Sequence, residues 1–313
     1  MSEVNNNVTT NEAEVTANST ITTMVERDMK QVSTKQKVVK IIVKVLLYAF
    51  LLTMAVIVLF PFYWMLISSV KSIDEYNLIN PTLFPKEIHF SNYVRAFNTA
   101  NLSTLFINTV YVGVVSTLLS LVITVLSAFA FARLEFKGKN TLFAILLATM
   151  MIPGELFTIT NYVTVYNLEW QDTYTALIVP FLVSVFYIYL LKQNFMQIPN
   201  ELYLAAKVDG TKDLKYLWKV MIPLALPTLI SITILKMMGA WNSYAWPRLV
   251  ANKPSMRLIT NGLRNAFTNA TTNETDYPVQ MAAVAIVSAP LFLVFLFLRK
   301  YIMKGVSRSG IKG

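Results

Sequence analysis

Cysteine is absent from this chain of 313 residues, and histidine occurs once, at His89. Without thiols the protein has neither a disulfide framework nor thiol chemistry. A single histidine excludes most metal sites, so no metal is expected. Charged residues are also scarce, at 14% of the chain, whereas a soluble domain carries about a quarter. The scarcity of charge excludes an ordinary soluble domain.

Patterns for catalysis are missing as well. The sequence contains no G-x-x-x-x-G-K-[ST] phosphate loop, so it is not expected to bind ATP by that route. We also find no nucleophile–base arrangement, metal cluster or paired catalytic carboxylates. The chain is therefore predicted not to be an enzyme by itself and to bind no cofactor. The net charge of +10 could suggest nucleic acid, but membrane proteins gather Lys and Arg at the cytoplasmic face. We therefore expect the chain to contact membrane lipid and not to bind nucleic acid.

Apolar residues dominate what is present: they make up 55% of the chain, and the mean hydropathy is +0.52. A membrane-spanning helix needs about 20 residues, and six apolar runs are long enough. They fall near residues 41–69, 106–132, 141–163, 174–193, 218–240 and 279–301. The sequence predicts an all-α membrane protein with a six-helix transmembrane domain over 38–302, a disordered cytoplasmic tail over 1–37 and a C-terminal tail over 303–313. No cleavable signal peptide is expected, because no apolar run begins before Val38.

The distribution of Lys and Arg predicts the orientation. If the N-terminus is cytoplasmic, nineteen of these residues fall in inside segments and seven in outside segments. The short loop 164–173, predicted outside, has none. Positive residues concentrate inside, so both termini and residues 194–217 are predicted to be cytoplasmic.

Proline occurs in five of the six predicted spans. Each proline removes a backbone donor and favours a kink, although proline is also simply commoner in membrane helices. The residues are Pro61, Pro153, Pro180, Pro223 with Pro227, and Pro290. Kinked spans would suit a conduit that changes shape.

A polar segment, 199–227, lies between two apolar runs and has the pattern helix, glycine, helix. Asn200 can cap a short helix whose N-terminal dipole favours Glu201. Gly210 suits the left-handed end of that helix, and Thr211 can cap the next one. The element, which also has a small face at Ala205 and Ala206, is predicted to lie along the membrane surface. Residue chemistry alone leaves two interpretations equally open: a docking knob and an ordinary interfacial loop.

Two ionisable residues, Glu155 and Lys236, lie within apolar runs. Such residues face protein or water rather than lipid. The two could form a structural ion pair across the bundle, or either could border an outward-facing cavity for a polar solute. Snorkelling of Lys236 is the third possibility. Trp241 and Asn242 follow the fifth span; they fit an interfacial belt or contacts to a sugar ring and its hydroxyls.

Most of residues 40–313 resembles the permease subunits of ABC importers, and in particular the MalG-like subunits of the carbohydrate-uptake branch. The coupling motif of that family is matched by Ala205, Ala206, Asp209, Gly210, Ile222, Pro223 and Leu224. The glutamate expected directly before the two alanines is Leu204 here, while Glu201 matches the upstream I-P-x-E-L pattern. Further matches are Asn92-Tyr93, 128–133, 136–139, Met151-Ile152-Pro153, Trp241-Asn242 and the tail 301–313.

The resemblance implies a type I importer fold in a bacterial cytoplasmic membrane. It implies a homologous but different second permease subunit, two ATPase subunits that use ATP and Mg, and an extracytoplasmic solute-binding protein. Residues implied in ATPase coupling are Glu201, Ala205, Ala206, Asp209, Gly210 and Pro223. The candidates for the substrate path are Glu155, Lys236, Trp241 and Asn242.

Three alternatives remain at this stage. Within the importer class, the solute could be glycerol-phosphate-like or another polar molecule instead of a sugar. A secondary transporter would need no ATPase and would show inverted repeats. A purely structural or receptor subunit would transport nothing even with its partners present.

Overall fold

The computed structural model describes residues 38–264, 266–268 and 274–307. The predicted tail 1–37 and residues 308–313 lie outside this part of the chain. Regular structure in the described part is helical, apart from one isolated bridge between Thr268 and Thr275. The prediction of an all-α protein is therefore confirmed.

The chain divides into two units, residues 1–64 and 65–313. Most of the first long helix, Val38–Ser69, belongs to the first unit. Its 32 residues are long and apolar enough to cross a membrane, and its hydrophobic side chains are exposed. This helix covers the predicted span 41–69.

Three long helices of the second unit have the length of membrane spans. They are α4 (Leu102–Arg133), the continuous helix Asp213–Trp241, and α14 (Tyr277–Ser307). Asp213–Trp241 comprises α10 (Asp213–Tyr216), the π-helical turn η3 (Leu217–Met221) and α11 (Ile222–Trp241). These helices cover the predicted spans 106–132, 218–240 and 279–301.

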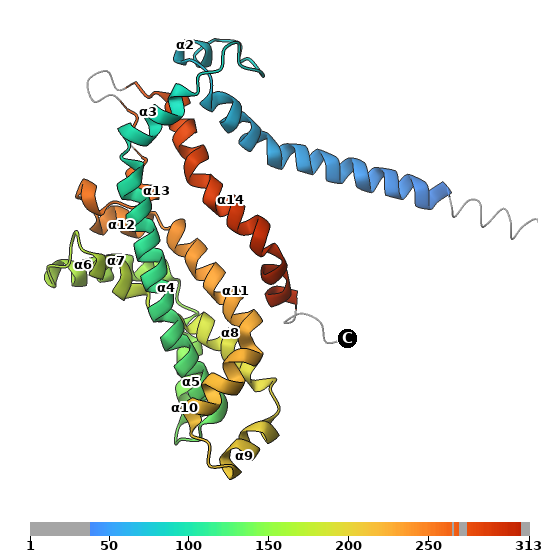
Figure 1. Cartoon of the computed structure of the whole chain (residues 1–313), viewed down its shortest axis with the longest axis vertical. Coiled ribbons are helices and arrows are strands. Elements are labelled where there is room, and N and C mark those ends of the chain that lie inside the picture. Colours follow the sequence, from blue (N-terminus) through green and yellow to red (C-terminus); the bar gives the residue numbers. More distant parts are fainter. Residues whose placement is uncertain (1–37, 265, 269–273, 308–313) are drawn as a thin grey trace, which may run out of the picture. The chain divides into compact units, whose positions relative to one another are not determined.

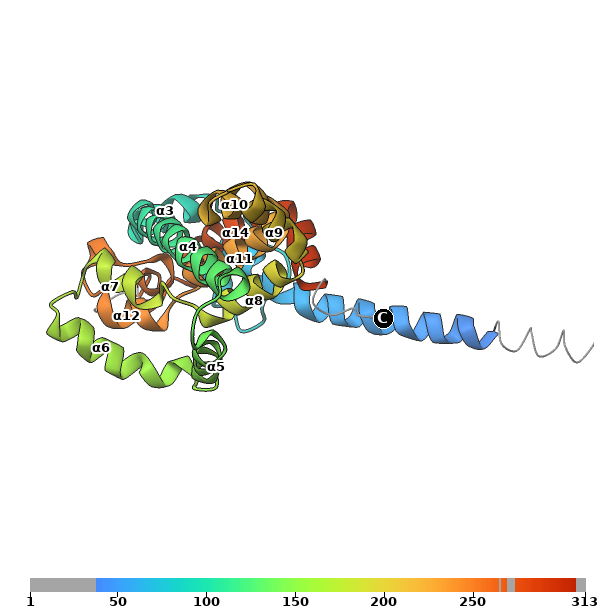
Figure 2. The same cartoon turned by 90° about the horizontal axis from the view of Figure 1, so that it is seen from below.

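The two remaining predicted spans are bent pairs. In the first, α5 (Lys139–Thr149) meets Gly154–Asn167 at 85°, a sharp turn that Figure 2 shows. This second segment contains η1 (Gly154–Phe157) and α6 (Thr158–Asn167). In the second pair, Tyr174–Phe181 meets α8 (Val185–Met196) at 47°. Tyr174–Phe181 consists of α7 (Tyr174–Ile178) and η2 (Val179–Phe181). The described residues contain six spans only if each pair counts as one.

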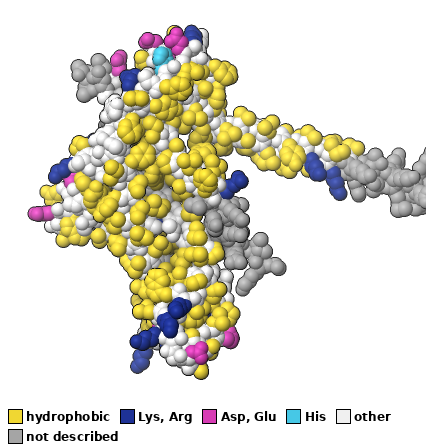
Figure 3. All heavy atoms as spheres, viewed as in Figure 1, with side chains coloured by type: hydrophobic (Ala, Val, Ile, Leu, Met, Phe, Trp, Pro, Cys, Tyr) yellow, Lys and Arg dark blue, Asp and Glu magenta, His cyan; other side chains and the backbone are white. Residues whose placement is uncertain are grey.

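Helix α4 is the centre of packing in the second unit and lies against both α8 and α11 (Figure 1). Its buried face is lined with small polar residues that allow close helix approach, as in other membrane bundles: Asn108, Thr109, Ser116, Thr117, Ser120 and Thr124. The largest apolar cluster joins Phe129 of α4, Phe195 of α8 and Met221 of η3. Apolar side chains also cover much of the visible surface (Figure 3), as expected where lipid replaces water.

Short helices occupy the two ends of this bundle. At the end where α4 begins lie α2 (Ile73–Tyr76), α3 (Ser91–Thr99), α12 (Ala245–Val250), η4 (Pro254–Met256) and α13 (Ile259–Gly262). At the end where α4 terminates lie α9 (Asn200–Val208) and α10 (Figure 1). The continuous helix Asp213–Trp241 runs from the α9–α10 end of the bundle toward the other end.

Candidate functional site

The first candidate site is the helix–glycine–helix element, now seen as α9 and α10. Pro199 takes the N-cap position of α9 with φ −54° and ψ 135°, and Asn200 is already helical. The expected capping role of Asn200 is therefore wrong, because a residue with helical backbone angles is past the cap. Glu201 lies in the first turn, as expected.

Gly210 ends α9 in the left-handed conformation, with φ +70°. Its N–H donates to the carbonyl of Lys207 at 3.0 Å, and the Thr211 N–H donates to the carbonyl of Ala206 at 2.8 Å. These two bonds form a complete Schellman motif. The expected cap by Thr211 is wrong: Lys212 is the N-cap of α10, and it makes no side-chain cap bond. Thr211 instead belongs to the turn that ends α9, where its N–H bonds the carbonyl of Ala206.

A polar cluster holds α9 against α10. Asp213 Oδ1 accepts from the Lys207 ammonium at 2.7 Å and from the Tyr203 hydroxyl at 2.9 Å. The Tyr203 ring also packs on Tyr216, with ring centroids 5.2 Å apart. The hydrogen bond to Asp213 raises the pKa of Lys207, so this ion pair is intact at neutral pH.

The outer face of α9 is apolar and uncovered within the second unit. Leu204 is 56% exposed and Val208 is 89% exposed, one helical turn apart. Ala205 is exposed beside them, whereas Ala206 packs against the largest core cluster. A surface of this kind, at a bundle end, is typical of a protein contact.

Arg133 anchors the base of this element, although it was not among the site residues predicted from the sequence. Arg133 is only 9% exposed, and its guanidinium donates to the carbonyls of Phe195 at 2.9 Å and Ile198 at 2.5 Å. Phe195 lies in the last turn of α8, and Ile198 lies in the link from α8 to α9. The available signal was the position of Arg133 at the end of the 128–133 motif.

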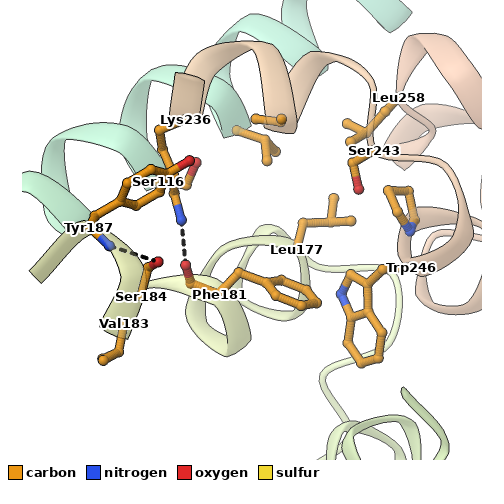
Figure 4. A pocket seen from close by; sticks show the side chains of 14 residues that line it. Ser116, Leu177, Phe181, Val183, Ser184, Tyr187, Lys236, Ser243, Trp246 and Leu258 are labelled. Atoms are coloured by element: carbon orange, nitrogen blue, oxygen red, sulfur yellow. Dashed lines mark hydrogen bonds between the residues drawn. The ribbon is translucent and has the colours of Figure 1, made fainter. Parts of the chain in front are cut away.

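The second candidate site is a pocket of about 380 Å³ between α4, η2, α8, α11 and α12 (Figure 4). Lys236 extends into it from α11 and donates to the carbonyl of Phe181 at 2.5 Å. Among its other lining residues are Ser116, Phe181, Ser184, Tyr187, Ser243 and Trp246. Of these, only Lys236 was assigned to the substrate path from the sequence; the rest come together through tertiary packing.

The other candidate path residues lie elsewhere. Trp241 packs among apolar residues and meets Phe106 edge-on at 5.8 Å. Asn242 is exposed and donates to the carbonyl of Met238 at 3.0 Å. Glu155 is exposed in η1, and no ion pair joins it to Lys236 in the described part of the chain. The proposed ion pair is wrong, because Lys236 bonds a carbonyl at the break in the fourth span.

A family model for the inner membrane component of binding-protein-dependent transport systems matches residues 24–308. The chain belongs to this family. It is thus a multi-pass membrane component of such a transport system.

Named members of the family align over nearly the whole length. The arabinooligosaccharides transport system permease protein AraQ of Bacillus subtilis is 28% identical over 86% of this chain and 96% of its own. The diacetylchitobiose uptake system permease protein NgcG of Streptomyces coelicolor is 28% identical over 84% and 87%. A crystal structure of a bacterial ABC transporter for import of the acidic polysaccharide alginate matches with a TM-score of 0.76 and 25% identity, covering 83% of this chain and 96% of that one.

Proposed function

We propose that the protein is a permease subunit of an ATP-driven ABC importer for sugars or oligosaccharides. It forms the translocation path with a homologous second permease subunit and receives solute from an extracytoplasmic binding protein. The relatives described above, which are named for oligosaccharide uptake, support this solute class. Two ATPase subunits use ATP and Mg, and this chain contributes no ATP site of its own.

The observation that carries the proposal is the exposed apolar face of α9. Leu204 and Val208 present it on an element that the Schellman turn, the Asp213 cluster and Arg133 hold in place. A docked ATPase subunit would cover this face. Because Leu204 replaces the family's glutamate, the contact at this position is apolar packing. In this assembly α9, with both chain termini, faces the cytoplasm.

A single helix can transmit movement from this element to the pocket. Asp213 begins the continuous helix that ends at Trp241 and carries Lys236. At 1.5 Å per residue, Asp213 and Lys236 lie roughly 35 Å apart along its axis. A tilt of α9 and α10 on ATP binding would therefore move the pocket lining with it. Glu201, Ala205, Asp209 and Pro223 belong to the α9–α11 stretch that would transmit this movement.

Recovery of the ATPase subunits with a tagged permease tests the docking role. Val208→Glu places a charge at the C-terminal end of the apolar face, and it should abolish recovery of the ATPase. Val208 is 89% exposed, so the substitution leaves the internal packing of the protein unchanged.

Ile79→Glu is the matched control, since Ile79 is 98% exposed and lies at the other end of the bundle. This variant should retain the ATPase at the wild-type level. Undiminished recovery with Val208→Glu, or equal loss with both variants, would contradict the docking role of α9.

A further inference from the structure

We propose that the pocket at Lys236 takes an acidic sugar, so that the imported solute is a carboxylate-bearing oligosaccharide such as a uronide. This inference rests on the proposed importer function and specifies its substrate class. Two separate basic features of the second unit support it: the charge of Lys236 inside the pocket, and a group of arginines that line a second hollow beside α12.

The Lys236 ammonium meets only a neutral partner. Its bond to the Phe181 carbonyl uses one of three donors, and none of the ion pairs in the described chain includes Lys236. No Asp or Glu lines the pocket. A cation held within a membrane bundle calls for a counter-charge or water. An entering carboxylate would supply that counter-charge.

The remaining pocket lining suits a sugar ring. Trp246 and Phe181 offer aromatic surfaces at one side, and Figure 4 shows Ser116 and Ser184 near the Lys236 side chain. Aromatic faces can pack on the C–H faces of a pyranose, while the serine hydroxyls can bond its hydroxyl groups. The lysine then stands where a carboxylate substituent of the ring would be received.

A second hollow, of about 210 Å³, is lined by Arg248, Arg257 and Arg264. Arg248 and Arg264 both donate to the hydroxyl of Tyr244, at 3.1 Å and 2.7 Å, and Arg257 donates to the Asn252 carbonyl at 3.0 Å. Within the described residues none of the three arginines has a carboxylate partner.

The acidic group near this hollow is already engaged. Asp172 accepts from the backbone N–H groups of Asn252 at 2.6 Å and Lys253 at 2.8 Å. Two guanidinium groups that converge on one neutral hydroxyl repel each other, so an added carboxylate would stabilise the group. Arginine is the residue best suited to planar recognition of a carboxylate.

Helix α12 connects the two features. Trp246 and Pro247 line the Lys236 pocket, whereas Arg248 of the same short helix and Ala251, which follows it, line the arginine hollow. In the proposed orientation this region faces outward, where Lys and Arg are normally depleted. An acidic protein surface could reach the arginines but not the recessed Lys236. An oligosaccharide with more than one carboxylate would supply a counter-charge to each feature, which favours it as the ligand.

Equilibrium binding to the purified permease–ATPase complex in nanodiscs tests the inference. The two probes are trigalacturonate and its fully methyl-esterified form, which share a skeleton and differ in charge. The wild-type complex should bind the acid about tenfold more tightly, equivalent to one charge-assisted hydrogen bond. Lys236→Met should remove this preference, and Lys236→Arg should keep it.

Lys219→Met is the matched control, because Lys219 is an exposed lysine on the same continuous helix. It should bind both probes as the wild type does. Arg248→Gln with Arg264→Gln provides a second variant that leaves the Lys236 pocket intact and should weaken binding of the acid alone.

The outcomes separate this inference from the importer function. Equal binding of acid and ester, binding of neither, or an unchanged preference in Lys236→Met would overturn the acidic substrate class. The importer function is measured in the same preparations by recovery of the ATPase subunits and by ATP hydrolysis. A complex that keeps its ATPase but shows no acid preference refutes the inference only.

Discussion

At the scale of single residues, Glu75 anchors the loop that follows the first long helix. Its carboxylate accepts from the Thr82 hydroxyl at 2.6 Å and from the Lys86 N–H at 3.0 Å. Burial raises the pKa of Glu75, but these hydrogen bonds and the neighbouring Lys71 and Lys86 charges hold it below the usual 4.5. The loop therefore depends on the charged form of one side chain.

This dependence predicts a pH effect with a definite sign. A carboxyl whose folded pKa is lowered contributes stability above its unfolded pKa and loses it as pH falls through the folded pKa. The protection factors for hydrogen exchange over residues 72–87, which are corrected for the intrinsic pH dependence of amide exchange, should therefore fall as the pH drops below 4.5. Glu75→Gln should exchange faster at neutral pH and show a flatter pH response. Equal protection in both proteins across this range would rule out the role of Glu75.

Local signals explain which residue roles could be predicted from the sequence. The left-handed Gly210 follows from backbone sterics at a helix end, and its φ of +70° confirms it. The caps assigned to Asn200 and Thr211 were wrong because the preceding proline and the Schellman turn already determine those positions. The partner of Lys236 could not be predicted, since it is a carbonyl exposed by a bend in another span.

At the scale of elements, the α9–α10 hairpin depends on Gly210. Proline at this position would force φ to about −65° and remove the N–H that bonds Lys207. Gly210→Pro should therefore open the Schellman turn and abolish solute-stimulated ATP hydrolysis, while the protein still reaches the membrane. Solute uptake and ATP hydrolysis, both measured in reconstituted vesicles, test this loss of coupling.

Lys212→Pro is the control for that change. Lys212 has φ −67°, which proline adopts readily, and it lies only two residues further along. Coupling should remain close to the wild-type level in this variant. Full transport by Gly210→Pro would show that the turn has no part in coupling.

Proline alone did not predict which spans bend. Pro227 and Pro290 lie inside unbroken helices, whereas the helices break beside Pro153 and Pro180. The broken spans have further stop signals: Gly154 follows Pro153, and the Ser184 hydroxyl caps the start of α8. In these two spans proline coincides with a neighbouring glycine or a capping serine, and hydropathy does not record that coincidence.

At the scale of the whole molecule, composition and hydropathy were enough to predict the membrane class and the helical fold. The family was predicted from short motifs such as 128–133 and 205–210. The pocket could not be predicted from the sequence, because Ser116, Tyr187 and Trp246 come from α4, α8 and α12 and meet only after folding. The docking element was accessible from sequence because it is one continuous segment, while the pocket is assembled from distant ones.

The central claim is that the exposed face of α9 lies on the cytoplasmic side and is covered by an ATPase subunit. The natural chain has no cysteine, so Val208→Cys introduces a unique thiol. Labelling with a membrane-impermeant maleimide should occur in inside-out vesicles and not in right-side-out vesicles, and added ATPase subunits should slow it. Labelling from the outside, or a rate unaffected by the ATPase, would contradict the account.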